Sequence, residues 1–164
     1  MIDWKSHFEP VFGELCWDVL DHHQLNLSMS FGEPHLSIRE PWPDAQMERL
    51  RYCRTVTPKG EYWLWALTAY WSIRRDGKTL ASTSSSARAR ADAVAQLNGQ
   101  RLVDVEVSES GVTRLTFDLG ITLELRRMDD EPGTIWDLYL PNEMVLSLET
   151  DGTFKYANAS GQPG

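Results

Sequence analysis

Few residues of this sequence have the type and spacing of a catalytic or cofactor-binding motif. The run Gly77-Lys78-Thr79 matches the end of a phosphate-binding loop, but the motif also requires a glycine where this chain has Ser72. His22 and His23 are adjacent, and adjacent side chains of an extended chain point to opposite faces, so they are not spaced to bind one metal ion. Asp129-Asp130-Glu131 has the charge of a calcium loop without its alternating ligands. We therefore expect hairpin turns at the first and last of these runs, no metal and no other cofactor.

The groups that could act as nucleophiles are also without a recognisable partner. Cys16 and Cys53 lie far apart and form no CxxC pair, which predicts two reduced thiols. The sequence contains no GxSxG motif. Either thiol could meet one of the four His residues, but any chain of this composition offers such combinations. We expect no catalytic residue, and an enzyme would require His, Cys and carboxylate side chains to converge in a cleft.

Seven tryptophans are the unusual feature of the composition. Four of them lie in segments that are typical of buried strands, and these we expect to be packed in the core: Trp63, Trp65, Trp71 and Trp136. Three others lie in irregular segments, where core packing and an anchoring role at a protein interface are both open: Trp4, Trp17 and Trp42. The second alternative makes these three candidate partner-binding residues.

Acidic side chains dominate the charge, with a net charge of −8 and a pI near 4.9. This balance argues against nucleic acid or an anionic membrane as the partner, because both require concentrated Lys and Arg. Six acidic residues alternate with apolar ones in the last third, which predicts positions on the solvent sides of strands: Asp104, Glu106, Asp118, Glu124, Asp137 and Glu149. They either maintain solubility and protect strand edges, or form a negative face that attracts a basic protein.

The elements that would position these residues are mainly short strands. A short helix is expected near the N-terminus, and alternation over Leu25–Phe31 and Leu36–Ile38 around Gly32-Glu33-Pro34 predicts a hairpin. Asp44 has the type of an N-cap for a helix that reaches Leu50. Bulky residues on both faces of Tyr62–Ile73 predict one central strand.

The second half of the chain reads as one helix followed by strands alone. Serines before Ala87 and the pair Asn98-Gly99 delimit a helix over Ala87–Leu97. After Gln100 the apolar residues alternate in short runs that are separated by tight turns, the last of them at Asp151-Gly152. These patterns predict an α+β fold: a large antiparallel, mostly meander β-sheet, with one main helix packed on a face and a short N-terminal helix. We expect a single domain over residues 1–157 and a flexible tail over 158–164.

The cellular location is predicted from what the sequence lacks. The first residues do not show the charged-then-apolar pattern of a signal peptide. The uncharged run Tyr62–Ile73 is too short to cross a bilayer. Together with two reduced thiols, these features predict a cytoplasmic protein.

Several segments resemble those of small bacterial proteins of unknown function: Leu25–Leu36, Phe117–Leu125, Trp136–Tyr139 and Val145–Asp151. This resemblance covers most of the chain and implies no activity. In strand pattern, size and acidity the chain also resembles the acidic α+β immunity proteins that neutralise secreted polymorphic toxins. That resemblance implies a cytoplasmic protein that occludes the active site of a cognate toxin. It carries over no binding residue, because no diagnostic motif is present.

The function expected from these observations is protein binding without catalysis. Its most specific form is an immunity-type inhibitor that binds a basic toxin through an acidic surface and exposed aromatic side chains. The alternative is a small-molecule-binding protein with an apolar pocket, lined by Trp and Tyr, under the helix. A large cavity beside Trp63–Trp71 would favour the small molecule, and a filled core with a flat acidic surface would favour the protein partner. The sequence does not identify the oligomeric state.

Overall fold

Two antiparallel sheets make up most of the structure, a computed structural model that describes residues 1–22, 26–128 and 132–159. The six-stranded sheet has the order β1-β2-β3-β9-β10-β11. Its strands are β1 (Cys16–Asp21), β2 (Leu27–Arg39), β3 (Thr55–Ala66), β9 (Thr134–Tyr139), β10 (Met144–Glu149) and β11 (Phe154–Asn158). The five-stranded sheet has the order β5-β4-β8-β7-β6. Its strands are β4 (Ala69–Arg75), β5 (Lys78–Ser82), β6 (Leu102–Val107), β7 (Thr113–Phe117) and β8 (Ile121–Arg127).

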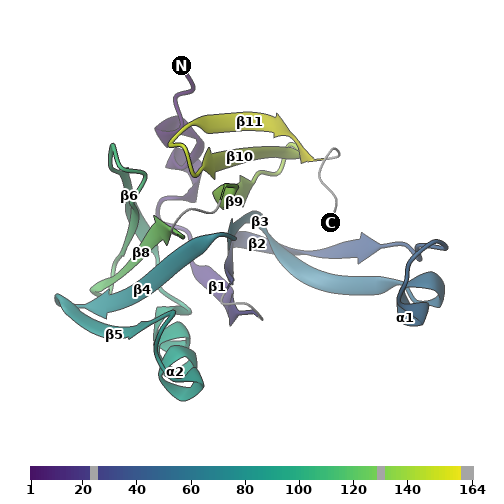
Figure 1. Cartoon of the computed structure of the whole chain (residues 1–164), viewed down its shortest axis with the longest axis horizontal. Coiled ribbons are helices and arrows are strands. Elements are labelled where there is room, and N and C mark those ends of the chain that lie inside the picture. The colour runs from purple at the N-terminus through teal and green to yellow at the C-terminus, as the bar shows by residue number, and fades with distance from the viewer. Residues whose placement is uncertain (23–25, 129–131, 160–164) are drawn as a thin grey trace.

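Helical structure is confined to short segments around these sheets. Two 3-10 turns, η1 (Lys5–His7) and η2 (Glu9–Val11), stand where a short N-terminal helix was expected. The helix α1 (Glu48–Tyr52) lies between β2 and β3, far from the main body of the molecule (Figure 1). The helix α2 (Ala87–Leu97) lies beside β1 and β5, and Ser86 caps it by accepting a hydrogen bond from the backbone N–H of Ala89.

One continuous core joins the two sheets. Its buried side chains come from both sheets, from α2 and from the η1–η2 segment. Trp136 of the six-stranded sheet donates a hydrogen bond from Nε1 to Oγ1 of Thr113 in the five-stranded sheet, at 2.8 Å. Phe8 lies edge-on against the Trp136 ring. The N-terminal turns therefore close one side of the space between the sheets.

The outer halves of β2 and β3 leave the body as a two-stranded ribbon that ends in α1 (Figure 1). We call residues 33–59 the arm. The arm begins at a β-bulge, where the pairing shifts between Phe31 and Pro34 and Gly32 has a positive φ of 76°. Gly60 lies opposite this bulge, and a Cβ there would stand 2.3 Å from the carbonyl oxygen of Phe31. Only glycine fits where the ribbon leaves the sheet.

The arm overturns two sequence predictions. The predicted hairpin turn at Gly32-Glu33-Pro34 is wrong, because this segment is a bulge inside the continuous strand β2, which pairs with β3. The predicted cap at Asp44 is also wrong, because α1 begins at Glu48 after Met47. A turn intervenes, in which the Ala45 N–H donates to the carbonyl of Trp42.

The single strand predicted over Tyr62–Ile73 is wrong as well. The run is divided at Leu67 and Thr68 between β3 and β4, which belong to different sheets. Both residues donate backbone hydrogen bonds to the β9 segment, Leu67 to Ile135 and Thr68 to Thr134. The chain thus crosses from one sheet to the other without a glycine or a proline to mark the break.

The predicted fold class is confirmed: the protein is α+β, mostly antiparallel strands with few short helices. The helix Ala87–Leu97 and the turn at Asp151-Gly152 are where the sequence places them. The domain limits stay predictions, and of the expected tail Asn158 ends β11 while residues 160–164 lie outside the described part. No helix in the described residues has the length and apolar character needed to cross a membrane.

Candidate functional site

The two faces of the arm differ in polarity. Directly paired residues of antiparallel strands project to the same face, and the pairs Leu36–Pro58 and Ile38–Val56 alternate with polar pairs. The polar face carries His35, Ser37, Arg39, Thr55, Thr57 and Lys59. On the other face Leu36, Ile38 and Val56 are 65%, 57% and 52% exposed. The arm is therefore an amphipathic ribbon whose apolar face is left in solvent.

More large apolar side chains are exposed at the tip of the arm. They are Trp42, Met47 and Tyr52, from the connecting segment and α1. Hydrogen bonds hold the tip together, since the Trp42 N–H donates to the carbonyl of Leu50 and the Arg51 side chain donates to the carbonyl of Ala45. Arg54 and Glu40 form an exposed ion pair at the end of the ribbon, which lowers the pKa of Glu40. A folded tip thus presents apolar groups that the core does not use.

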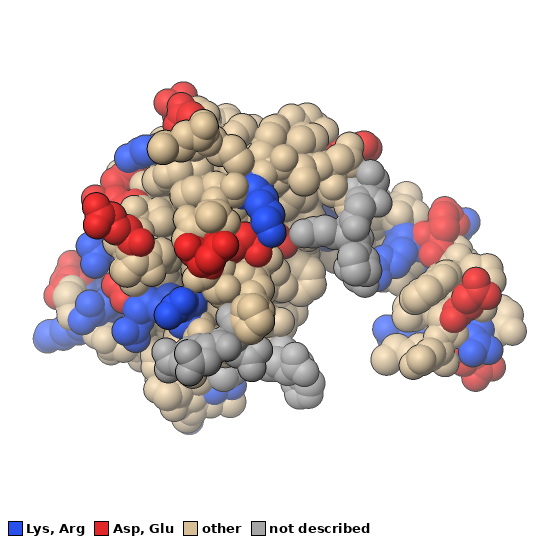
Figure 2. Space-filling model, turned by 45° about the horizontal axis from the view of Figure 1, so that its top comes forward, with Lys and Arg blue, Asp and Glu red and all other residues tan. Residues whose placement is uncertain are grey.

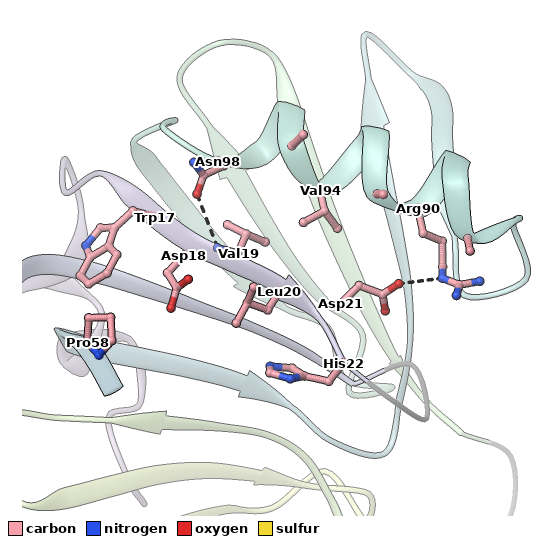
Figure 3. Close-up of a pocket in the computed structure, with 13 residues that line it drawn as sticks. Trp17, Asp18, Val19, Leu20, Asp21, His22, Pro58, Arg90, Val94 and Asn98 are labelled. Atoms are coloured by element: carbon pink, nitrogen blue, oxygen red, sulfur yellow. Dashed lines mark hydrogen bonds and ion pairs between the residues drawn. The ribbon is translucent and has the colours of Figure 1, made fainter. Parts of the chain in front are cut away.

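A groove of about 910 Å³ lies between β1 and α2 (Figure 3). The β1 side contributes Trp17, Asp18 and Leu20, and the α2 side contributes Val94 and Asn98. The register of β1 shifts between Trp17 and Leu20, and Asp18 has a positive φ of 51° there. This bulge explains why the β1 wall of the groove is irregular.

Carboxylates lie within this groove. Asp21 Oδ2 accepts a hydrogen bond from Nε of Arg90 at 2.8 Å, and Arg90 also donates to the carbonyl of Ser85 (Figure 3). The other oxygen of Asp21 is buried and has no hydrogen-bond partner in the described part of the chain. Asp18 forms no ion pair with any described residue. The carboxylates of the groove can therefore accept more hydrogen bonds than Arg90 donates to them.

The groove and the arm are parts of one surface. Pro58, which shares the apolar face of the arm with Leu36, also lines the groove beside Trp17 (Figure 3). Apolar contact area therefore runs from the groove onto the apolar face of the ribbon, and Trp42 is exposed at the tip of the same arm. We call this combined area the arm–groove surface.

The structure separates the three tryptophans that the sequence offered as interface anchors. Trp4 stacks on Phe154, with ring centroids 5.3 Å apart, and packs against the core. Trp17 lines the groove and donates from Nε1 to the carbonyl of Gly32. Trp42 is 60% exposed at the tip of the arm. Two of the three thus lie on the arm–groove surface.

The tryptophans that the sequence placed in the core are also divided. Trp71 and Trp136 are buried between the sheets. Trp63 and Trp65 are only partly buried and lie on the outer face of the six-stranded sheet, so their placement in the core is wrong. The crossing at Leu67 and Thr68 explains the difference, because it reverses the face on which odd-numbered residues meet the core. The hollow beside Trp63 and Trp65 is lined by no residue of α2.

The six acidic candidates do not gather on one face. Asp104, Glu106, Asp118 and Glu124 belong to the five-stranded sheet and its turns, whereas Asp137 and Glu149 belong to the six-stranded sheet. Most have a basic or backbone partner, in the pairs Lys5–Asp104, Arg114–Glu106, Arg114–Glu124 and Lys155–Glu149, and in the bond from the Arg101 N–H to Asp118. Acidic and basic atoms are accordingly interspersed on the body (Figure 2).

Asp137 corrects the predicted solvent exposure of these six residues. It is 2% exposed and accepts a 2.5 Å hydrogen bond from the Ser147 hydroxyl of the neighbouring strand. The side chain projects from the face opposite to Leu138, but neighbouring side chains on that face cover it. Burial and the charge of Asp137 together raise the pKa of Tyr139 to about 12.

The residues considered for catalysis remain dispersed. His22 shares a hydrogen bond with the Ser28 hydroxyl at 2.6 Å, Cys16 is buried and Cys53 is exposed on the arm. Gly77-Lys78 belongs to the predicted hairpin turn between β4 and β5. No cluster of metal-ligating side chains occurs in the described residues, while His23 and Asp129-Asp130-Glu131 lie outside them.

The sequence interpretation missed the arm, although a signal for it exists. Leu36 and Ile38 alternate with polar residues in the same way as Val56 and Pro58, on either side of a Pro-rich connection. The two runs could have been paired with each other. No protein-family model matches the chain, and neither a curated protein nor a solved structure was found to be similar to it.

Proposed function

We propose that this protein is a non-catalytic protein-binding module that holds a basic protein partner on its arm–groove surface. The observation that carries the proposal is the exposed apolar face of the arm, with Leu36, Ile38 and Val56 each more than half exposed. Clustered exposed apolar groups on a monomer are typical of interaction sites, whereas single ones need no explanation. A two-stranded ribbon is also barely stable alone in water, so a partner that covers one face would add to its stability.

The charge of the groove favours a basic partner. A Lys or Arg side chain could lie with its aliphatic part against Trp17, Leu20 and Pro58 and direct its cation to the carboxylates of Asp18 and Asp21. Asp18, which forms no ion pair with any described residue, would then gain a cationic partner. This arrangement replaces the broad acidic face expected from the sequence with a local acidic groove.

The specific form of the proposal is an immunity-type inhibitor of a basic toxin. An inhibitor needs complementarity and no catalytic group, which fits an arm that extends from a folded body (Figure 1) and has one exposed apolar face. The acidity and the strand pattern of the chain support this form by resemblance. The arm would lie along the toxin while the groove receives one of its basic side chains.

Cys53 allows the partner to be captured at the arm itself. This thiol is exposed directly after α1, so a maleimide that carries a photoreactive group can be attached there. Irradiation in a lysate of the producing cells, followed by mass spectrometry, should identify a basic protein bound to the arm. The variant Cys53→Ser with Ser110→Cys, labelled in the β6–β7 turn instead of on the arm, is the control for random contact.

The purified partner then allows a quantitative comparison between matched surface variants. Leu36→Ser, Val56→Ser and Trp42→Ala should each weaken binding, and the Trp42 variant by about 30-fold or more if it is an interface hot spot. Leu119→Ser and Val103→Ser are the controls, because these side chains are as exposed as Leu36 and Val56 but lie on the body. Equal affinities in both sets would refute the proposal.

The inhibitor form has its own test. The captured protein should be toxic or enzymatically active alone, and one equivalent of this protein should suppress that activity. If a saturating amount of this protein leaves the activity of the captured protein unchanged, the protein-binding proposal stands and inhibition is excluded.

A further inference from the structure

The outer face of the six-stranded sheet has a hollow of about 710 Å³, within the size range of ligand pockets. Its floor is aromatic: the ring centroids of Trp63 and Trp65 are 4.9 Å apart, and those of Trp63 and Tyr139 are 5.0 Å apart. The strand register explains this grouping, because Trp63 pairs with Tyr139 and Trp65 pairs with Asp137 on neighbouring β3 and β9. Rings that are only partly buried in such a hollow leave apolar faces available to a ligand.

Two cations stand at the end of the hollow that adjoins the arm. Lys59 and Arg39 both line it, and Lys59 Nζ lies 4.0 Å from the centroid of the Trp63 ring. Neither cation forms an ion pair with any carboxylate in the described part of the chain. Burial, and then the charge of Arg39, lower the pKa of Lys59, which means that the site disfavours its own positive charge. An anion between the two cations would relieve this repulsion.

The opposite end of the hollow limits how such an anion can lie. Asp137 is at that end, buried and hydrogen-bonded by Ser147, and its charge acts on Tyr139. The adjoining hollow shares Lys59 and Trp63 and contains the carboxylates of Glu61 and Glu143. An anionic group is therefore favoured only near Lys59 and Arg39, and the rest of the ligand must be uncharged and apolar to contact Trp65, Leu67 and Tyr139.

We propose that this hollow binds an amphipathic organic anion, with its acidic group between Lys59 and Arg39 and a flat apolar body against Trp65 and Tyr139. The acidic group can be a carboxylate, a sulfonate or a phosphate, since each presents oxygens to ammonium and guanidinium donors. Lys59 would move from the Trp63 ring to the anion and uncover that ring for stacking. The site lies on the polar side of the arm, opposite to the apolar face of the arm–groove surface, and does not depend on a protein partner.

Two dyes with the same aromatic framework test the proposal directly. 1-Anilinonaphthalene-8-sulfonate carries an anionic group, and N-phenyl-1-naphthylamine lacks it. Fluorescence titration of the intact protein should show tighter binding of the sulfonate dye, by about tenfold or more. Lys59→Met and Arg39→Gln should each remove most of this advantage and leave the neutral dye unaffected. Displacement by 1-naphthylacetate or by 1-naphthyl phosphate, which share an apolar ring system, then distinguishes a carboxylate ligand from a phosphate ligand.

The controls separate this hollow from other apolar surfaces. Arg54→Gln and Lys78→Met remove exposed cations elsewhere and should not change the affinity of either dye. Ile38→Ser removes apolar area from the arm and should not change the affinity for the sulfonate dye. Trp63→Leu should weaken both dyes. The proposal is overturned if wild-type protein binds the two dyes equally, if the Lys59 and Arg39 variants keep the sulfonate preference, or if Ile38→Ser abolishes it.

Discussion

At the scale of single residues, the fold gives the two cysteines opposite environments that the sequence does not distinguish. Cys16 is fully buried at the start of β1, and burial raises the pKa of its thiol. Cys53 is exposed on the arm. Because the thiolate is the reactive form, and Cys16 is shielded as well as protonated, Cys53 should react alone in the native protein.

A thiol-specific reagent such as 5,5′-dithiobis(2-nitrobenzoate) measures this difference. We predict that one equivalent of thiol reacts rapidly at pH 8, and that the second reacts at least about a thousand times more slowly, through opening of the fold. In guanidinium chloride both should react at similar rates. Rapid reaction of two equivalents in native protein would show that β1 is not packed as described.

At the scale of elements, the arm is expected to be separable from the body. Its large apolar side chains are exposed, and Ala45 is the one buried residue between positions 33 and 59. We predict that replacing residues 36–58 by Asn-Gly, a sequence that favours a two-residue hairpin turn, leaves the free energy of unfolding of the body within about 1 kcal/mol of its original value. The pair His35–Lys59 would then flank the new turn.

Guanidinium denaturation followed by circular dichroism gives this free energy for both proteins. The shortened protein should unfold in one transition and should fail to bind the partner captured through Cys53. Loss of several kcal/mol would mean that the arm supports the core. Unchanged partner binding would place the interface elsewhere on the molecule.

Elements whose limits are set by local signals can be predicted from the sequence. The helix α2 was predictable because Ser86 caps it and Asn98-Gly99 ends it, and these signals act locally. The turn between β10 and β11 was predictable from Asp151-Gly152 for the same reason. The bulge at Gly32-Glu33-Pro34 uses residues that also favour a turn. Only the pairing of β2 with β3, a long-range contact, decides between the two structures.

At the scale of the whole molecule, the candidate sites were harder to predict than the fold. Trp63, Trp65 and Trp71 have the same parity in the sequence, and the crossing between the sheets at Leu67 and Thr68 places Trp71 in the core and the other two on an outer face. The arm–groove surface joins Trp17, Pro58 and α2, which are distant in the chain. Such surfaces follow from topology, and alternation along one strand does not contain that information.

A side-chain hydrogen bond joins the two sheets across the core. Trp136 is fully buried, and its Nε1 donates to Thr113 Oγ1 across the core at 2.8 Å. Trp136→Phe should lower the free energy of unfolding by about 2–4 kcal/mol, because it leaves a cavity and removes the donor. Thr113→Val should cost about 1–3 kcal/mol, because the buried indole N–H loses its acceptor. Trp42→Phe, an exposed control, should cost less than about 0.5 kcal/mol.

The double variant distinguishes the hydrogen bond from the packing around it. If the bond couples the sheets, Trp136→Phe combined with Thr113→Val should cost less than the sum of the single variants, by about 0.5–1.5 kcal/mol, because neither group is then left without its partner. Chemical denaturation gives the free energy of unfolding of the wild-type protein, the two single variants and the double variant, which together form a double-mutant cycle. Additive costs would mean that this bond does not couple the sheets, and that Trp136 contributes through the packing of its ring, which includes Phe8 and Phe154.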